Sequence, residues 1–202
     1  MSSRHVEFLV EEPSMKAFLE VMIPRLRPDV KSLVHAFQCK DDLLKNLPAR
    51  LKGYSNWIPD NHRIVVLVDR DADDCRALKD QLETVARDAG LVTRSRAGKK
   101  PYDVVNRIVV EELEAWFFGD WEAVRTAYPR APAGIVKKAG FRYPDAISGG
   151  TWESFERMLQ KAGYFRSGLR KTEVARNIAR HMCADRNRSH SFRIFLDAVR
   201  DL

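Results

Sequence analysis

The chain has 202 residues, of which 45% are hydrophobic and 31% are charged, so it is long enough to bury the core of an ordinary domain. Its three cysteines, Cys39, Cys75 and Cys183, are widely separated and fit neither a disulfide framework nor a zinc site. No apolar segment approaches the length of a membrane span, about 20 residues, and no signal-peptide core is present. The composition excludes membrane-spanning, disulfide-stapled and zinc-finger proteins, and we expect a cytoplasmic protein.

The net charge of +7 is unevenly divided along the chain. Residues 1–120 carry 19 basic and 20 acidic side chains, whereas residues 121–202 carry 16 basic and 8 acidic ones. An acidic, metal-holding half beside a half that attracts polyphosphate would produce this division. The alternative is an ordinary solvated basic surface, because the excess is modest beside that of dedicated nucleic-acid-binding proteins.

The first part of the chain alternates between strand and helix patterns. Strand patterns occupy residues 6–10, 30–37, 64–68 and 107–110, with a short one at 91–93. Apolar residues at helical spacing lie between them: Met15, Phe18, Leu19, Met22 and Leu26; then Leu44, Leu47 and Leu51; then Leu78, Leu82, Val85 and Ala89. This alternation predicts an α/β fold over residues 1–128, with a mostly parallel sheet flanked by helices.

The pattern changes in the last third of the chain. Residues 129–150 are rich in Pro, Gly and Ala and predict a long excursion across the surface. Three short helical patterns follow, with aromatic stripes that we interpret as core rather than as a binding platform. We therefore expect residues 129–202 to form a basic, mostly helical extension packed on the α/β core.

The most informative stretch is the apolar run at residues 64–68, which ends in the acidic cluster Asp69-Arg70-Asp71-Ala72-Asp73-Asp74. Ligands of parallel α/β sheets gather at the carboxyl ends of such buried strands. In extended backbone, Asp69 and Asp71 would project to one side and share a hard cation such as Mg²⁺. The alternative is that Asp71, Asp73 or Asp74 only caps the next helix, which explains one aspartate better than four.

Two further acidic clusters follow other predicted strands. Glu11 and Glu12 come after the first strand, and Glu111, Glu112 and Glu114 come after the strand that ends at Val110. Because the carboxyl ends of parallel strands share one edge of the sheet, these carboxylates can converge, and a divalent metal would relieve their repulsion. The alternative for the last cluster is a helix first turn, where acidic residues are favourable.

These motifs resemble the TOPRIM domain of type IA topoisomerases, DnaG-type primases and OLD-family nucleases. A closer resemblance is to a bacterial TOPRIM-like family catalogued as domain of unknown function 4276. It rests on Val66-Leu67-Val68-Asp69-Arg70-Asp71, Asp74-Cys75-Arg76-Ala77-Leu78-Lys79, Glu112-Leu113-Glu114-Ala115-Trp116, Lys171 and Ser189-His190-Ser191-Phe192. The resemblance covers nearly the whole chain and implies a Rossmann-like, Mg²⁺-dependent phosphoryl-transfer fold. It also implies nuclease activity beside a partner ATPase in phage or mobile-element defence.

Two positions depart from the pattern. TOPRIM proteins commonly place glycine directly after the first glutamate, and the closer family tends to have a second acid four residues after it; these positions are Glu12 and Met15 here. Glycine permits close backbone approach, whereas Glu12 adds bulk and charge. The departures concern catalysis more than the fold, because a ligand or general base is missing from the pattern.

The expected activity is hydrolysis of phosphodiester bonds in nucleic acid, assisted by Mg²⁺ or Mn²⁺. Asp69 and Asp71 would hold the ion with Glu112 or Glu114, and Glu11 would be a ligand or the general base. By analogy with OLD-type nucleases, Lys171 would neutralise charge on the phosphate. Phosphate contacts without sequence specificity are expected from Arg166, Arg170, Lys171, Arg176 and Arg180.

Two alternatives come from other functional classes. The first is a non-catalytic or regulatory subunit that keeps the fold and acts through a partner, which the residues Glu12 and Met15 favour. The second is a small-molecule phosphatase or phosphotransferase, because such enzymes also place Asp-x-Asp after a strand. Glu11 would have no role in that chemistry.

Overall fold

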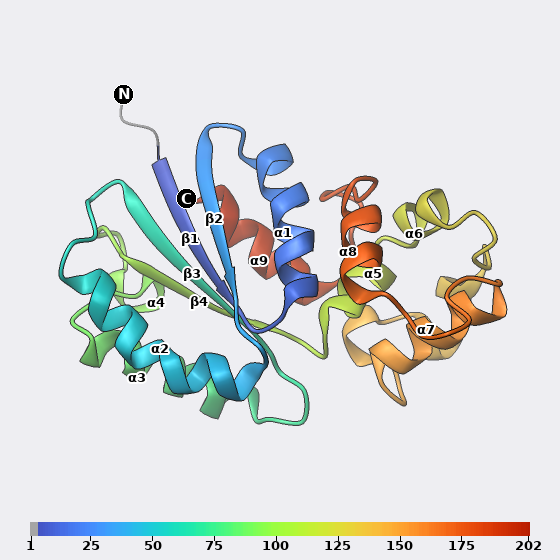
Figure 1. Cartoon of the computed structure of the whole chain (residues 1–202), viewed down its shortest axis with the longest axis horizontal. Coiled ribbons are helices and arrows are strands. Elements are labelled where there is room, and N and C mark those ends of the chain that lie inside the picture. The colour runs from blue at the N-terminus through green and yellow to red at the C-terminus, as the bar shows by residue number, and fades with distance from the viewer. Residues whose placement is uncertain (1–3) are drawn as a thin grey trace.

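The computed structural model describes residues 4–202, which contain a four-stranded, fully parallel sheet (Figure 1). The strand order is β2-β1-β3-β4, with β1 (Arg4–Val10) and β3 (His62–Asp69) in the centre and β2 (Val30–Ala36) and β4 (Val104–Val109) at the edges. In this register Val10, the last residue of β1, lies beside Ala36 and Leu67. The predicted α/β class with a parallel sheet is confirmed.

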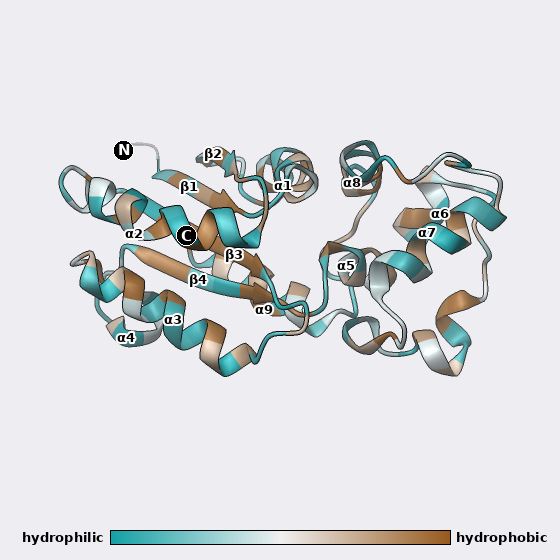
Figure 2. Cartoon of the chain, turned by 60° about the horizontal axis from the view of Figure 1, so that its bottom comes forward, coloured by the Kyte–Doolittle hydropathy of each residue, from teal (hydrophilic) through white to brown (hydrophobic). Residues whose placement is uncertain are grey.

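Helices cover both faces of the sheet (Figure 2). Helices α1 (Pro13–Leu26) and α9 (His190–Arg200) share a hydrophobic core with one face, through residues such as Phe8 and Leu67. Helices α2 (Lys40–Ser55) and α3 (Cys75–Asp88) cover the other face, through residues such as Leu9 and Val66. Side chains alternate between the two faces along each strand, so both central strands are rich in apolar residues.

The prediction of a short strand at residues 91–93 is wrong. Only Thr93 forms a bridge, to Val104, and helix α4 (Arg94–Ala97) begins directly after it. Val92 is 46% exposed, and its N–H donates to the carboxylate of Asp103 rather than to a strand. A buried polar network stabilises this region, because Glu83 of α3 accepts hydrogen bonds from Thr93, Ser95, Lys79 and Asn106.

The chain after β4 forms a second group of helices, at the right of Figure 1. It contains α5 (Leu113–Gly119), α6 (Trp121–Ala127), α7 (Thr151–Lys161) and α8 (Lys171–Ala179). The expected surface excursion at 129–150 contains three single 3-10 turns, Ile135–Lys137, Ala139–Phe141 and Pro144–Ala146. Ile135 and Ile147 of this segment are buried, so it also contributes to the core.

The C-terminal helices pack back on the first half of the chain. Helix α8 lies against α1, and α9 contacts β4. The aromatic stripes are largely core, as expected: Phe155, Phe192 and Phe195 are fully buried, whereas Trp152 is half-buried. Trp116 of α5, also fully buried, stacks on Phe195 of α9. The Ser189-His190-Ser191 motif holds α9 in place, because the Asp145 carboxylate accepts hydrogen bonds from both hydroxyl groups and from the His190 N–H.

The helices were also compared with the requirements for crossing a membrane. Within residues 4–202, none of the helices combines the length and the apolar composition that a membrane crossing requires.

Candidate functional site

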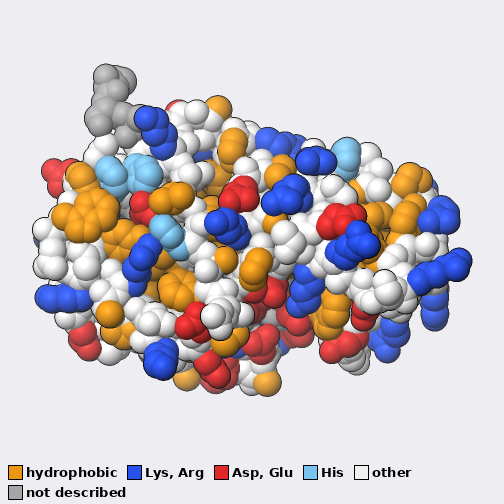
Figure 3. All heavy atoms as spheres, in the orientation of Figure 1, with side chains coloured by type: hydrophobic (Ala, Val, Ile, Leu, Met, Phe, Trp, Pro, Cys, Tyr) orange, Lys and Arg blue, Asp and Glu red, His pale blue; other side chains and the backbone are white. Residues whose placement is uncertain are grey.

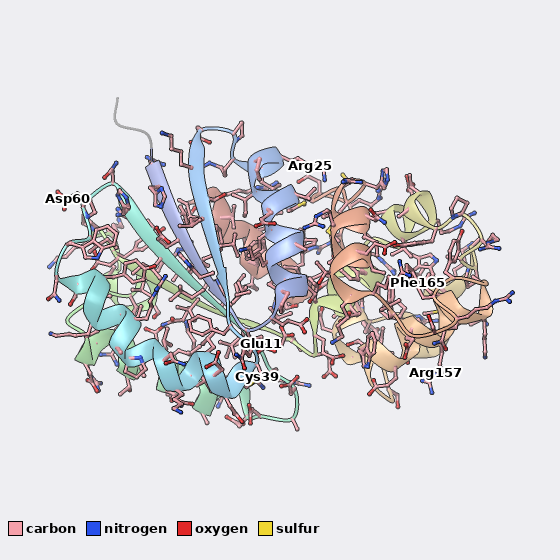
Figure 4. All side chains as sticks on the ribbon, in the orientation of Figure 1. Glu11, Arg25, Cys39, Asp60, Arg157 and Phe165 are labelled. Carbon is pink, nitrogen blue, oxygen red and sulfur yellow. The ribbon has the colours of Figure 1, made fainter. Side chains whose placement is uncertain are left out.

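The carboxyl edge of the sheet brings together acidic residues from three strand ends. Glu11 follows β1, Asp69 is the last residue of β3, and Glu114 lies in the first turn of α5, shortly after β4. The Glu11 Oε2 atom accepts a hydrogen bond of 3.1 Å from the Asp69 N–H. Figure 4 shows Glu11 and Cys39 beside each other at this edge. Parallel pairing thus gathers acidic residues from three distant parts of the sequence.

Asp69 and Glu114 are buried carboxyl groups, with 5% and 2% of their surface exposed. Burial raises the pKa of Asp69 well above its usual range, and repulsion from Glu11 raises it further. Burial also raises the pKa of Glu114 to about 7, against the attraction of Lys171. Within residues 4–202, the Oε2 atom of Glu114 has no hydrogen-bond partner. A buried, unsatisfied carboxylate oxygen calls for a proton or a cation.

Glu11 borders an open cleft of about 440 Å³ at this edge. Burial raises the pKa of Glu11 to about 7, and the Asp71 charge adds to the shift, whereas the hydrogen bond from Asp69 opposes it. Near neutral pH, such a group can both accept and release a proton. The cleft is lined by Glu11, Glu12, Gln38, Cys39, Lys40, Asp41, Asp71, Ala72 and Asp73.

Asp71 reaches the cleft by a different route from the one expected. The backbone is not extended here, because Asp71 has a φ of +48° in a turn after the strand. Short polar residues tolerate this left-handed conformation better than most. The capping alternative holds for Asp74, which accepts hydrogen bonds from the N–H groups of Arg76 and Ala77 at the start of α3. Asp69 and Asp71 therefore differ in setting: the first is buried and the second is half-exposed.

Lys40 is a member of the site that the sequence patterns did not indicate. Its Nζ atom lies 2.5 Å from the Asp71 carboxylate and 3.0 Å from that of Asp73. Burial disfavours the charged amine, but hydrogen bonds to both aspartates outweigh it and raise the pKa of Lys40. The sequence could have indicated Lys40 only through its position. It is the first residue of α2 and follows β2, the strand beside β1.

The three glutamates after β4 have different partners. Glu111 has a φ of +63° and pairs with Arg70. The Oε2 atom of Glu112 accepts hydrogen bonds from the Thr151 hydroxyl (2.8 Å) and the Trp152 N–H (2.9 Å), at the start of α7. Of the three, Glu114 is the buried residue with an unsatisfied oxygen, and it is the best-placed candidate ligand.

Lys171, at the start of α8, supplies a positive charge to the buried acids. Its Nζ atom is 3.6 Å from a carboxylate oxygen of Glu12 and 4.5 Å from the ring centroid of Trp152. Burial disfavours its charge, but the attraction of Glu114 and Glu12 outweighs this and raises the pKa of Lys171. Lys171 is therefore a fixed cation at the acidic site.

The expected phosphate-contacting residues are only partly gathered. Arg170, Lys171 and Arg176 line one groove of about 520 Å³ on α8, whereas Arg166 and Arg180 do not line it. Arg176 also pairs with Glu20 of α1 at 3.9 Å. In Figure 3 acidic side chains gather at the lower centre, near the strand ends, and basic side chains spread over the half to their right. A groove that is basic on balance, with three cations and the acidic residue Glu173, which pairs with Arg170, thus starts at the acidic site, through Lys171.

The donor set suits a hard divalent cation, because it offers several carboxylate oxygens, one of them unsatisfied and buried. Within residues 4–202, however, no three His, Cys, Asp or Glu side chains are arranged so that they could hold a metal ion together. The site therefore has the oxygen ligands that a divalent cation prefers, but these ligands are not arranged as a complete coordination shell.

Comparisons with known proteins identify the family of this chain. The solved C-terminal region of the Xanthomonas campestris pv. campestris OLD protein is similar over 98% of this chain and 93% of its own, with 19% identity and a TM-score of 0.43. No curated protein gives a significant match. The family described as Domain of unknown function (DUF4276) matches residues 10–200, almost the whole chain. The chain belongs to the DUF4276 family.

Proposed function

We propose that this chain is a TOPRIM-type nuclease that hydrolyses phosphodiester bonds in nucleic acid with the help of Mg²⁺ or Mn²⁺. The observation that carries the proposal is the pair of buried acids, Asp69 and Glu114, at the carboxyl edge of the sheet, within the field of Lys171. Burying two acidic groups in one place costs folding free energy, which a bound cation would recover. Two buried acids at one place do not stabilise the fold, so a role in binding or catalysis is the better explanation for their burial.

The residues would divide the chemistry as follows. Asp69 and Glu114 would hold the ion from the buried side, and Asp71 would join them only by leaving its ion pair with Lys40. The ion would supply Lewis acidity and a water of lowered pKa. Glu11 borders the cleft with a pKa of about 7, so it is suited to accept the proton of the attacking water.

Lys171 and the basic groove would bind the substrate. Lys171 would balance charge on the reacting phosphate, because its position over Trp152 and beside Glu12 is already fixed. Arg170 and Arg176 would contact neighbouring phosphates along the groove. These contacts involve no base edges, so the enzyme would bind without sequence specificity.

A direct test is cleavage of plasmid, linear and single-stranded DNA and of RNA by the purified chain, with Mg²⁺, Mn²⁺ or a chelator. We expect metal-dependent cleavage that is lost in Asp69→Asn and Glu114→Gln and retained in Asp88→Asn, which changes an exposed acid of α3. Melting curves would verify that each variant is folded. Cleavage that persists in chelator, or in both site variants, would refute the proposal.

One observation favours a second candidate, a non-catalytic or regulatory subunit. The Asp71 carboxylate is already balanced by Lys40 at 2.5 Å, where a metal would otherwise bind. In that case the chain would act through a partner, and an ATPase is the class that the family resemblance suggests. A wild-type chain that is inactive alone but supports cleavage or ATP hydrolysis when combined with such a partner would favour this alternative.

A further inference from the structure

A further pocket lies in the C-terminal half, away from both the acidic cleft and the groove on α8. It has a volume of about 440 Å³ and lies between the 3-10 turns of residues 135–141 and the second half of α7. Pockets for small ligands commonly measure about 300–1,000 Å³. Its lining shares no residue with the cleft, and Figure 4 shows Arg157, one of its lining residues, well separated from Glu11.

The floor of this pocket is apolar. Ile135 and Met158 are buried beneath it, and Phe141 is half-buried beside Phe118, with a centroid distance of 5.5 Å. Apolar side chains make up half of the ten residues that line the pocket, and Pro132 and Ala162 complete this apolar set. Such a floor accepts a flat ring, whose removal from water is favourable.

The rim of the pocket is basic. It carries four cationic side chains, Arg130, Lys138, Arg157 and Lys161, and no acidic residue of the described chain lines the pocket. Arg130 lies over the ring of Tyr164, 4.3 Å from its centroid, and donates to the Gly163 carbonyl oxygen. Arg157 donates to the Ser154 hydroxyl. Two guanidinium groups are thus held in position, which lowers the entropy cost of binding an anion.

Floor and rim together select the class of ligand. An inorganic anion would leave the apolar floor uncovered, and a fatty-acid anion carries too little charge for four cations. A nucleoside phosphate combines a flat ring with an adjacent group of concentrated negative charge. We propose that this pocket binds a nucleoside phosphate, with its base on the floor and its phosphate at the basic rim. Binding of a free nucleotide here does not depend on the phosphodiester chemistry proposed above, whereas binding of a strand that also occupies the acidic site rests on it.

Two sources share this chemistry: a free nucleotide, and an unpaired nucleotide within a strand. Helix α7 links the pocket to the acidic site, because its Trp152 N–H binds Glu112 and its later residues Arg157 and Lys161 line the pocket. At 1.5 Å per residue, these positions lie ~8–14 Å apart along the helix. A strand that occupied the acidic site would therefore pass within a few nucleotides of the pocket.

The test measures binding to the full chain in a chelator, so that metal-dependent binding at the acidic site does not contribute. Calorimetry would compare adenosine 5′-monophosphate, adenosine, inorganic phosphate, decanoate and a hexamer of deoxyadenylate. We expect the monophosphate to bind at least tenfold more tightly than adenosine or phosphate. Preference for the hexamer over the monophosphate that is lost when Lys138 and Lys161 are changed to alanine would identify a strand as the source, because the α8 groove can also bind the hexamer, and preference for the monophosphate would identify a free nucleotide.

Matched variants locate the binding. Lys138→Ala with Lys161→Ala removes two rim charges and should weaken monophosphate binding at least tenfold. Lys137→Ala with Arg142→Ala removes the same charge from positions outside the pocket and should change affinity less than twofold. Ala162→Phe fills the pocket without altering charge and should also abolish binding. Equal affinity for phosphate and monophosphate, tighter binding of decanoate, or unchanged binding in the rim and filling variants would overturn the proposal.

Discussion

The ammonium group of Lys171 lies 3.6 Å from the carboxylate of Glu12, so the start of α8 meets the residue that precedes α1. This ion pair joins the basic C-terminal half of the chain to the acidic edge of the sheet. It also gives Glu12 a partner, at the position where TOPRIM proteins commonly have glycine. Glu12 therefore belongs to the electrostatic balance of the site, together with Glu114.

The first prediction concerns metal and stability. Mg²⁺ or Mn²⁺ should raise the melting temperature, because the ion relieves repulsion among the carboxylates, with about 2.7 kcal/mol of stabilisation at a hundredfold excess over its dissociation constant. Asp69→Asn should remove this response. Differential scanning calorimetry with and without the ion provides the measurement. A melt of the variant that still responds fully would mean that the ion binds elsewhere.

The second prediction concerns pH in the absence of metal. The pKa of Glu114 in the folded protein is about 7, above the 4.5 of an unperturbed glutamate, so the folded state binds more protons between these values. The free energy of unfolding should therefore fall as pH rises from 4.5 to 7, by up to about 3 kcal/mol from this group. Urea denaturation in chelator should show a shallower fall for Glu114→Gln. Identical pH profiles of the variant and the wild type would contradict the assignment.

The third prediction concerns Lys171. Lys171→Gln should slow any metal-dependent cleavage by about 10²–10³-fold, because a fixed charge beside the reacting phosphate is removed. It should also raise the pKa of Glu114 further, because Lys171 opposes that shift. Single-turnover cleavage and the pH profile of stability measure the two effects. Lys16→Gln, an exposed lysine of α1 paired with Glu20, is the control and should change neither.

The fourth prediction separates binding from catalysis. Neutralising Arg176 and Arg180 together should reduce the slope of log affinity for nucleic acid against log salt by up to about two, because each phosphate that an arginine neutralises adds about one to that slope. Because only Arg176 lines the groove, a change near one is the expected value. Asp71→Ala should leave binding intact or strengthen it while cleavage disappears. Fluorescence anisotropy over a salt series would test both, and a weaker affinity of Asp71→Ala would count against the division of roles.

The fifth prediction concerns the polar network of α3. Burial opposes the charge of Glu83, but its hydrogen bonds, first from Lys79, outweigh this and lower its pKa to about 2. The stabilisation is therefore present above pH 4.5 and is lost as pH falls from 4.5 to 2. Glu83→Gln should lower the free energy of unfolding by about 2–3 kcal/mol at pH 7 and by much less at pH 2–3. Asp88→Asn, an exposed acid of the same helix, should have little effect at either pH.

Much of the framework could be predicted from the sequence, because it depends on local patterns. The apolar run at 64–68 predicts a buried strand regardless of which strands pair with it. In the structure this strand is only slightly longer, His62–Asp69. The short pattern at 91–93 failed because three residues carry little information and Asp103 provides a competing hydrogen bond. For Asp71, the assumption of extended backbone failed because the chain turns directly after the strand.

The linear order of residues is enough to place acidic groups after three strands of a parallel sheet, and hence at one shared edge. The packing of the chain decides which of these groups are buried. It also decides which carboxylate oxygen lacks a hydrogen-bond partner and which cations balance the negative charge. Lys40 and Lys171 come from helices far apart in the chain, so no local pattern connects them with Asp71 or Glu12. The pKa of a carboxyl group depends on burial and on neighbouring charges, and both arise only when distant segments are brought together.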